Sequence, residues 1–111
     1  MSHPAHAAPT AADATRKLLA SLWQKNLPML RERLALLEAA AQAAEAGTLT
    51  EEQRHEAGST AHKLAGSLGT FGYPRGTELA RALEHRFDSD QPLKGAGLAG
   101  QVISLRSELA V

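Results

Sequence analysis

The stretch that decides the fold is AHKLAGSLGTFG, residues 61–72. Its apolar residues Ala61, Leu64 and Leu68 recur every three or four positions, which is the spacing of one buried face of a helix. We therefore predict a helix from Glu51 to about Leu68, with an apolar stripe that packs against other helices.

The outward-facing residues of this helix are unusual. Gly66 and Gly69 lie inside it, although each interior glycine costs about 1 kcal/mol relative to alanine. Steps of four and seven residues place both glycines on the same face as His62, and Ser59 lies about one turn earlier on that face. His62 is therefore expected to stand on a face with few side chains, where the backbone of a partner can approach the imidazole ring.

The segment before this helix has a helical pattern of its own, over residues 13–46. Asp13 is the predicted N-cap, and Gly47 is predicted to end the helix. Pro28 lacks a backbone N–H and disfavours helical geometry at the preceding residue, so we expect a kink or two helices that meet near Asn26. The apolar stripe of this segment consists of Leu27, Leu30, Leu34, Leu37, Ala41 and Ala44.

Three further signals complete the predicted architecture. Thr50 followed by Gln53 resembles a capping box, which would begin the helix at Glu51. Two more amphipathic patterns, residues 73–87 and 97–109, predict a third and a fourth helix. These helices and their short connections predict an all-α fold, an antiparallel four-helix bundle with an additional N-terminal helix.

The composition agrees with a helical fold and excludes several classes of function. Of the 111 residues, 43% are hydrophobic and only 4% are aromatic, and alanine and leucine dominate, which favours helices. The 12 basic and 12 acidic residues cancel, so we predict no binding to nucleic acid or to a membrane surface. The absence of cysteine excludes disulfides, thiol catalysis and cysteine-ligated metals.

The chain is predicted to form one domain. Residues 1–12 contain Pro4, Pro9 and small residues without apolar periodicity, so we expect a disordered tail or linker, in which His3 and His6 have no specific role. Residues 13–111 form the predicted domain. No apolar run approaches the roughly 20 residues that span a bilayer, and the N-terminus lacks a signal-peptide pattern, so we expect a cytoplasmic protein.

A histidine on such an open face suits nucleophilic phosphoryl transfer. Histidine is largely neutral near neutral pH, so a ring nitrogen can attack phosphorus that a partner holds. Positive charge should help to hold the phosphoryl oxygens, and Lys63 is adjacent in sequence. Glu84 is the predicted orienting carboxylate, because it follows apolar Leu83 on the next antiparallel helix just as His62 follows an apolar residue.

The run HKLAGSLGTFG, followed by LARALE, resembles the signature of histidine phosphotransfer domains, and its GTFG part is similar to the phosphorylated domain of bacterial chemotaxis kinases. The resemblance covers residues 61–84. It implies that His62 is phosphorylated, that Gly66 permits docking of a receiver domain, and that Glu84 is the hydrogen-bonding carboxylate. It also implies a helical bundle without ATP-binding elements.

The partners implied are a response-regulator receiver domain, a hybrid sensor kinase, or both. No cofactor is expected in this chain, because the magnesium ion and the acceptor aspartate would belong to the receiver. We expect a monomer, since a bundle of this size is able to bury its apolar stripes internally.

The sequence departs from the resembled pattern at one position. The family commonly has a lysine three residues after the histidine, where this chain has Ala65. Lys63 would have to reach around the helix to replace it. Arg81 lies three residues before Glu84 on the same face, and we hypothesise that it supplies the missing charge.

Two alternative functions compete with phosphotransfer. The first is a metal site that includes His55 and His62, but two turns of helix separate them by about 10 Å, too far to share one ion. The second is a non-catalytic helical adaptor that docks a receiver domain, an alternative to which Ala65 gives some support. Trp23 and Tyr73 are interpreted as packing residues.

Overall fold

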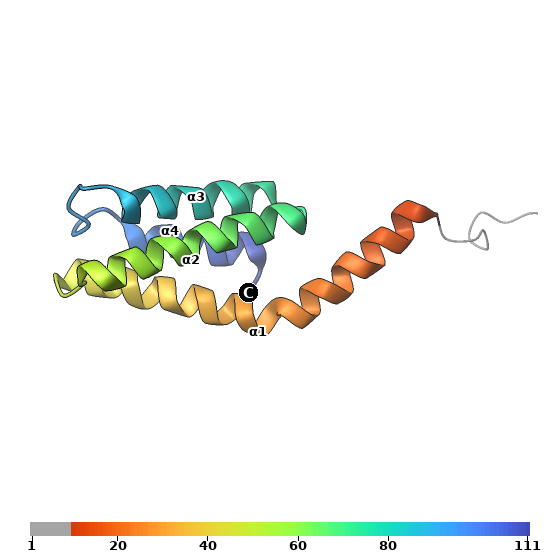
Figure 1. Cartoon of the computed structure of the whole chain (residues 1–111), viewed down its shortest axis with the longest axis horizontal. Coiled ribbons are helices and arrows are strands. Elements are labelled where there is room, and N and C mark those ends of the chain that lie inside the picture. Colours follow the sequence, from red (N-terminus) through yellow and green to blue (C-terminus); the bar gives the residue numbers. More distant parts are fainter. Residues whose placement is uncertain (1–9) are drawn as a thin grey trace, which may run out of the picture.

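The computed structural model describes residues 10–111, which form four helices in a bundle (Figure 1). They are α1 (Ala11–Ala46), α2 (Glu51–Thr70), α3 (Pro74–Asp88) and α4 (Leu98–Leu109). Neighbouring helices in the chain run antiparallel, and α4 also packs against α1, which closes the bundle. The predicted all-α fold is confirmed.

The core consists of the stripes that the sequence pattern indicates. Leu34 and Leu37 of α1, Leu64 and Leu68 of α2, and Leu83 of α3 have almost no exposed surface. The fourth helix contributes Val102 and Leu105 to the same core. Each buried leucine removes an apolar side chain from water, which stabilises the fold by roughly 1.5–3 kcal/mol per residue.

The first helix begins earlier than the sequence pattern indicates. Its N-cap is Thr10, whose hydroxyl accepts a hydrogen bond from the backbone N–H of Asp13, and the Asp13 carboxylate accepts from the backbone N–H of Thr10. The prediction of Asp13 as the N-cap is wrong, because Asp13 is the third helical residue of this capping box. The hydrogen bonds from Thr10 lower the pKa of the Asp13 carboxyl. Two residues assigned to the predicted tail, Ala11 and Ala12, are helical, and residues 1–9, with His3 and His6, lie outside the described residues.

A separate N-terminal helix is not found in the described part of the chain. Residues 11–46 form one helix with Pro28 inside it, and the helix changes direction along the part that contains the proline (Figure 1). Pro28 removes a single N–H, while the hydrogen bonds on either side continue, so the helix bends instead of ending. We call Ala11–Leu27 the N-terminal extension. It projects beyond the end of the bundle and contacts it through Leu27, which packs against the core, and through Trp23, which stacks on Tyr73 and meets the edge of Phe71.

The bundle is most tightly packed between α2 and α3. A capping box of Thr50 and Gln53 begins α2, as predicted. At the same end of this pair, the guanidinium of Arg54 donates hydrogen bonds to the carbonyl oxygens of Phe87, Ser89 and Gln91, which secures the C-terminus of α3. No helix in residues 10–111 is long and apolar enough to cross a membrane.

Candidate functional site

His62 and Glu84 form a hydrogen-bonded pair at the edge between α2 and α3. Nδ1 of His62 lies 2.7 Å from Oε2 of Glu84. The imidazole side chain is 74% exposed, whereas the glutamate side chain is 22% exposed. The carboxylate is therefore partly shielded between the helices, and the ring projects from the surface with its other nitrogen, Nε2, on the side away from the carboxylate.

The close packing of α2 and α3 positions this pair. Gly58 lies against Asp88, so close that a Cβ atom on the glycine would come within 2.4 Å of the carboxylate oxygen. At the other end of the helix pair, Gly69 faces the hydroxyl of Thr77. These two contacts and the hydrogen bond of His62 belong to one antiparallel register, in which each residue of α2 has a fixed neighbour on α3.

Thr77 adds a bond between the two helices. Its hydroxyl donates to the backbone carbonyl of Ala65 over 3.3 Å, in a partly buried position. Gly58 and Thr77 thus both lie at the contact between α2 and α3, and neither was among the residues expected to contribute to the site. The available signal was their spacing, since Gly58 lies four residues before His62 and Thr77 lies seven before Glu84.

The face around His62 is open, as the glycine pattern indicates. Ser59, Gly66 and Gly69 are exposed on the same side of α2 as the imidazole. A Cβ atom built on Gly66 would meet no atom within 4 Å, so the fold itself does not require a glycine there. A flat surface of this kind lets another protein bring its backbone close to the ring.

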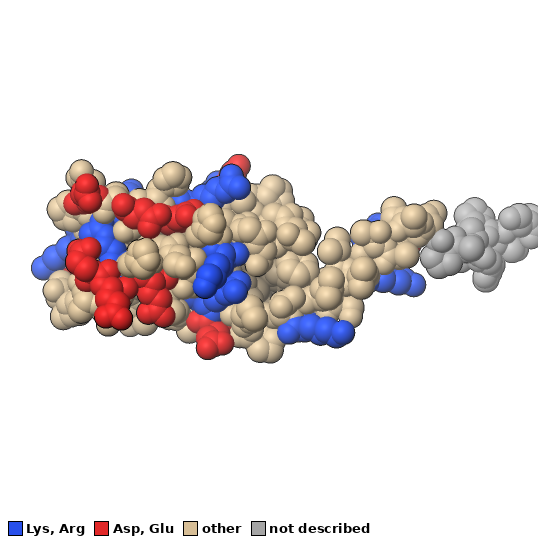
Figure 2. Space-filling model, viewed as in Figure 1, with Lys and Arg blue, Asp and Glu red and all other residues tan. Residues whose placement is uncertain are grey.

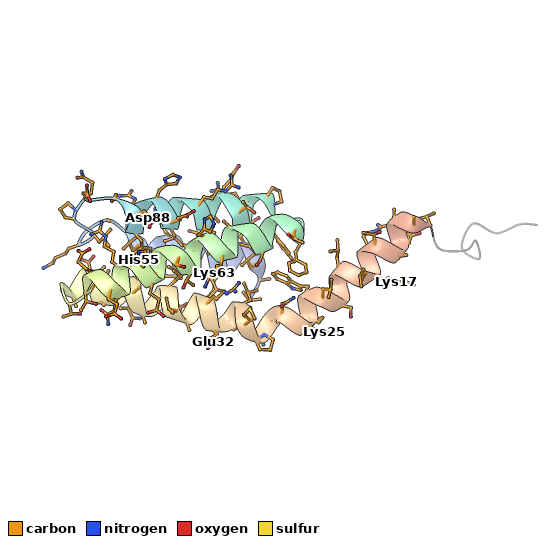
Figure 3. All side chains as sticks on the ribbon, viewed as in Figure 1. Lys17, Lys25, Glu32, His55, Lys63 and Asp88 are labelled. Atoms are coloured by element: carbon orange, nitrogen blue, oxygen red, sulfur yellow. The ribbon has the colours of Figure 1, made fainter. Side chains whose placement is uncertain are left out.

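The three positions that bear on the missing lysine lie in different surroundings. Ala65 is only 5% exposed, because it faces α3. Lys63 is exposed on α2, about 100° around the helix from His62 and on the side toward α1 (Figure 3). Arg81 is exposed on α3, and the register of the two helices places it level with Ala65. Neither Lys63 nor Arg81 forms an ion pair with another residue of the described range.

The chemistry of the pair of His62 and Glu84 depends on which nitrogen of the imidazole ring carries the proton. An ionised carboxylate only accepts hydrogen bonds, so Nδ1 of His62 carries the proton that Glu84 holds. The lone pair of the neutral ring is then on Nε2, which faces solvent. The arrangement provides an exposed nucleophilic nitrogen in a fixed tautomer, with a carboxylate behind it that stabilises positive charge on the ring.

The structure gives no support to a metal site in the part of the chain that it describes. No three histidine, aspartate or glutamate residues between Thr10 and Val111 are grouped so that they are able to hold one ion. His55 lies two turns from His62 along α2, nearer to the N-terminus of that helix (Figure 3). The two histidines are therefore about 10 Å apart along the helix, too far to bind one ion together.

Comparison with known proteins agrees with the geometry. A family model described as Hpt domain matches residues 9–110 of the chain. The chain is also similar to Protein RcaC of Microchaete diplosiphon, with 33% identity over 85 residues. That similarity covers 74% of this chain but 13% of RcaC, so the chain spans a small part of that relative. No solved structure gives a significant match.

Proposed function

Because this chain belongs to the Hpt domain family, whose members carry phosphoryl groups in two-component phosphorelays, we propose that His62 is its phosphorylated residue. The observation that carries the proposal is the pair formed by His62 and Glu84. An exposed histidine whose Nδ1 is held by a carboxylate 2.7 Å away presents Nε2 as the nucleophile. The donor and the acceptor of the phosphoryl group are aspartates of response-regulator receiver domains, including those of hybrid sensor kinases.

The proposed transfer forms one bond and breaks one bond. The lone pair on Nε2 of His62 attacks phosphorus, the bond between phosphorus and the aspartyl oxygen of the receiver breaks, and the electron pair leaves with the aspartate carboxylate. The proton on Nδ1 stays in its hydrogen bond to Glu84, whose negative charge balances the positive charge of the phosphorylated ring. The reverse reaction returns the phosphoryl group to an aspartate.

Positive charge for the phosphoryl oxygens is proposed to come from two sources. The receiver supplies its own Mg²⁺, which is why this chain needs no cofactor. Within the chain, Arg81 is the stronger candidate, because it is level with Ala65 and lies one turn from Glu84 on the same edge of α3. Lys63 would serve only by reaching around α2.

The proposed docking surface for the receiver is the open face of α2. Ser59, Gly66 and Gly69 form it together with the imidazole of His62. A receiver aspartate lies in a loop, and its phosphoryl group reaches Nε2 only if the surrounding backbone comes within a few ångströms of α2. Gly66 is central to this approach, because its missing side chain leaves open space.

Transfer from a labelled receiver tests the proposed function. The chain is incubated with a panel of receiver domains that carry ³²P on aspartate, and its label is examined for the acid-labile, base-stable behaviour of phosphohistidine. His62→Ala should abolish labelling. His55→Ala is the matched control, because His55 is also exposed on α2 and should not affect labelling. Labelling that persists in His62→Ala would overturn the assignment, whereas receiver binding without labelling would favour the adaptor.

A further inference from the structure

The N-terminal extension has an apolar side that nothing in the described chain covers. Leu18 is 60% exposed, Leu22 is 38% exposed, and Met29 just beyond Pro28 is 49% exposed. An isolated helix of this length is marginal in water, since most helices in proteins are stabilised by packing of an apolar face. A partner that covered this apolar side would therefore stabilise the extension beyond what the packing of Trp23 provides.

A groove of matching character lies on the other half of α1. It runs between α1 and α2, and its apolar floor is formed by Leu36, Ala39 and Ala43 of α1 together with Leu49. Gln53 and Glu56 of α2 form its polar edge. The α1 residues that line the groove lie between Leu36 and Ala43, a length of about 12 Å, which is long enough for the two turns of the extension that carry Leu18 and Leu22.

The charges of the two regions are complementary. The extension carries three basic residues, Arg16, Lys17 and Lys25, and one acidic residue, Asp13, which forms an ion pair with Arg16, and Figure 2 shows Lys and Arg side chains along it. Acidic side chains gather at the opposite end of the bundle, with some basic side chains among them (Figure 2). The acidic residues at the start of α2 and beside the groove are Glu51, Glu52 and Glu56.

We propose that the extension of a second copy of the chain occupies this groove. In an antiparallel pair of α1 helices, a two-fold axis close to Pro28 places the extension of each copy along the groove of the other. Leu18 and Leu22 then pack over the part of α1 that contains Leu36 and Ala39. Symmetry covers both extensions and fills both grooves, so the monomer expected from the sequence gives way to a dimer.

The same axis pairs opposite charges at the centre of the dimer. Lys25 and Glu32 lie two turns apart on one side of α1, with Pro28 between them (Figure 3). Antiparallel pairing brings Lys25 of one copy against Glu32 of the other, and this pair occurs twice. His62 stays accessible in the dimer, because it lies on the α3 side of α2 and the groove lies on the α1 side.

Sedimentation equilibrium of the full chain tests the apolar contact. The wild-type chain should form a reversible dimer, and the double variant Leu18→Glu/Leu22→Glu should raise its dissociation constant about 100-fold or more. Ile103→Glu is the control, since Ile103 is 64% exposed on α4 and lies outside the proposed interface. A wild-type chain that stays monomeric at about 500 μM would overturn the proposal. So would an equal loss of dimer in the control.

Charge reversal tests the antiparallel arrangement. Lys25→Glu and Glu32→Lys should each weaken the dimer about tenfold, and the double variant should restore it because the pair is rebuilt with opposite signs. A double variant weaker than either single variant would overturn the arrangement. The dimer-breaking variants should still become labelled on His62, so the two proposals fail independently. A third outcome is possible, in which the wild-type chain is monomeric and Leu18→Glu/Leu22→Glu prevents receiver binding. In that case the extension contacts the receiver, and the proposed dimer is wrong.

Discussion

Gly58 and Gly66 lie about two turns apart on the same helix, and their surroundings are opposite. Gly58 is buried against α3, where a Cβ atom would approach the Asp88 carboxylate to 2.4 Å and the Cβ of Phe87 to 3.5 Å. Gly66 is exposed, and a Cβ atom there would meet nothing within 4 Å. Packing against α3 explains the glycine at position 58, whereas no packing contact in residues 10–111 explains the glycine at position 66.

This difference separates two causes of a helical glycine. At Gly58 the missing side chain leaves room for the side chains of Asp88 and Phe87 of α3. At Gly66 the glycine destabilises the helix by about 1 kcal/mol relative to alanine, and no packing contact within the described chain requires it. The position of Gly66 on the same face as His62 agrees with a docking surface for a receiver.

The largest expected effect comes from filling the open face. Gly66→Leu should slow transfer from a phosphorylated receiver by about 100-fold, because the side chain keeps the partner backbone away from His62. Its thermal stability should stay unchanged or rise, since leucine favours a helix more than glycine does. Gly100→Leu is the control, because Gly100 is also an open helical position but lies on α4. Normal transfer by Gly66→Leu would contradict the proposed docking surface.

The second effect concerns the packed position. Gly58→Leu should lower the free energy of unfolding by about 2 kcal/mol, because the side chain forces α2 and α3 apart. Urea denaturation measures this change, with Gly66→Leu as the comparison on the same helix. If both leucine variants are equally stable, the contrast between the two glycines is wrong.

A third effect is expected on the rate of phosphotransfer when Arg81 of α3 is changed. Arg81→Ala should slow phosphotransfer about tenfold, and adding Ala65→Lys should restore part of the rate by returning a cation to α2. The rate is measured by single-turnover transfer from a labelled receiver. Arg86→Ala serves as the control, since Arg86 is exposed on α3 but faces away from Glu84. An unaltered rate in Arg81→Ala would exclude its proposed role.

The smallest effect is expected at Thr77. Thr77→Val removes the hydroxyl that donates to the Ala65 carbonyl, so the free energy of unfolding should fall by about 1 kcal/mol. Thr77→Ser keeps the hydroxyl and should retain most of that bond. Urea titration of the two variants distinguishes them, and equal stabilities would mean that the bond contributes little to the packing of α2 against α3.

Much of the fold was predictable because apolar periodicity determines which side of each helix is buried. The stripes of α1 and α2 follow from leucine and alanine spacing, and the capping box of Thr50 is visible as a local motif. The start of α1 was not, because Thr10 and Asp13 are both good capping residues and only the backbone geometry distinguishes them. The effect of Pro28 depended on whether the neighbouring hydrogen bonds survive, which spacing alone does not reveal.

The candidate site was predictable to a similar degree. The spacing of His62 and Glu84 relative to the buried stripes placed them on facing edges, and the structure brings them within hydrogen-bonding distance. The role of Gly58 was not foreseen, because the exact register of two helices depends on side-chain packing along their whole length. The position of Arg81 level with Ala65 was not predictable for the same reason, because it also depends on the register of α2 against α3.

The turn of residues 71–73 between α2 and α3 has a consequence for the order of folding. All residues proposed for the reaction lie on these two helices, which are adjacent in the chain and joined by this short turn. Contacts between neighbouring helices form rapidly, because closing a short loop loses little chain entropy. On the ribosome this helical pair emerges before α4, so the histidine and its carboxylate should meet before the bundle is complete. Amide exchange during refolding should therefore protect α2 and α3 first and α4 last.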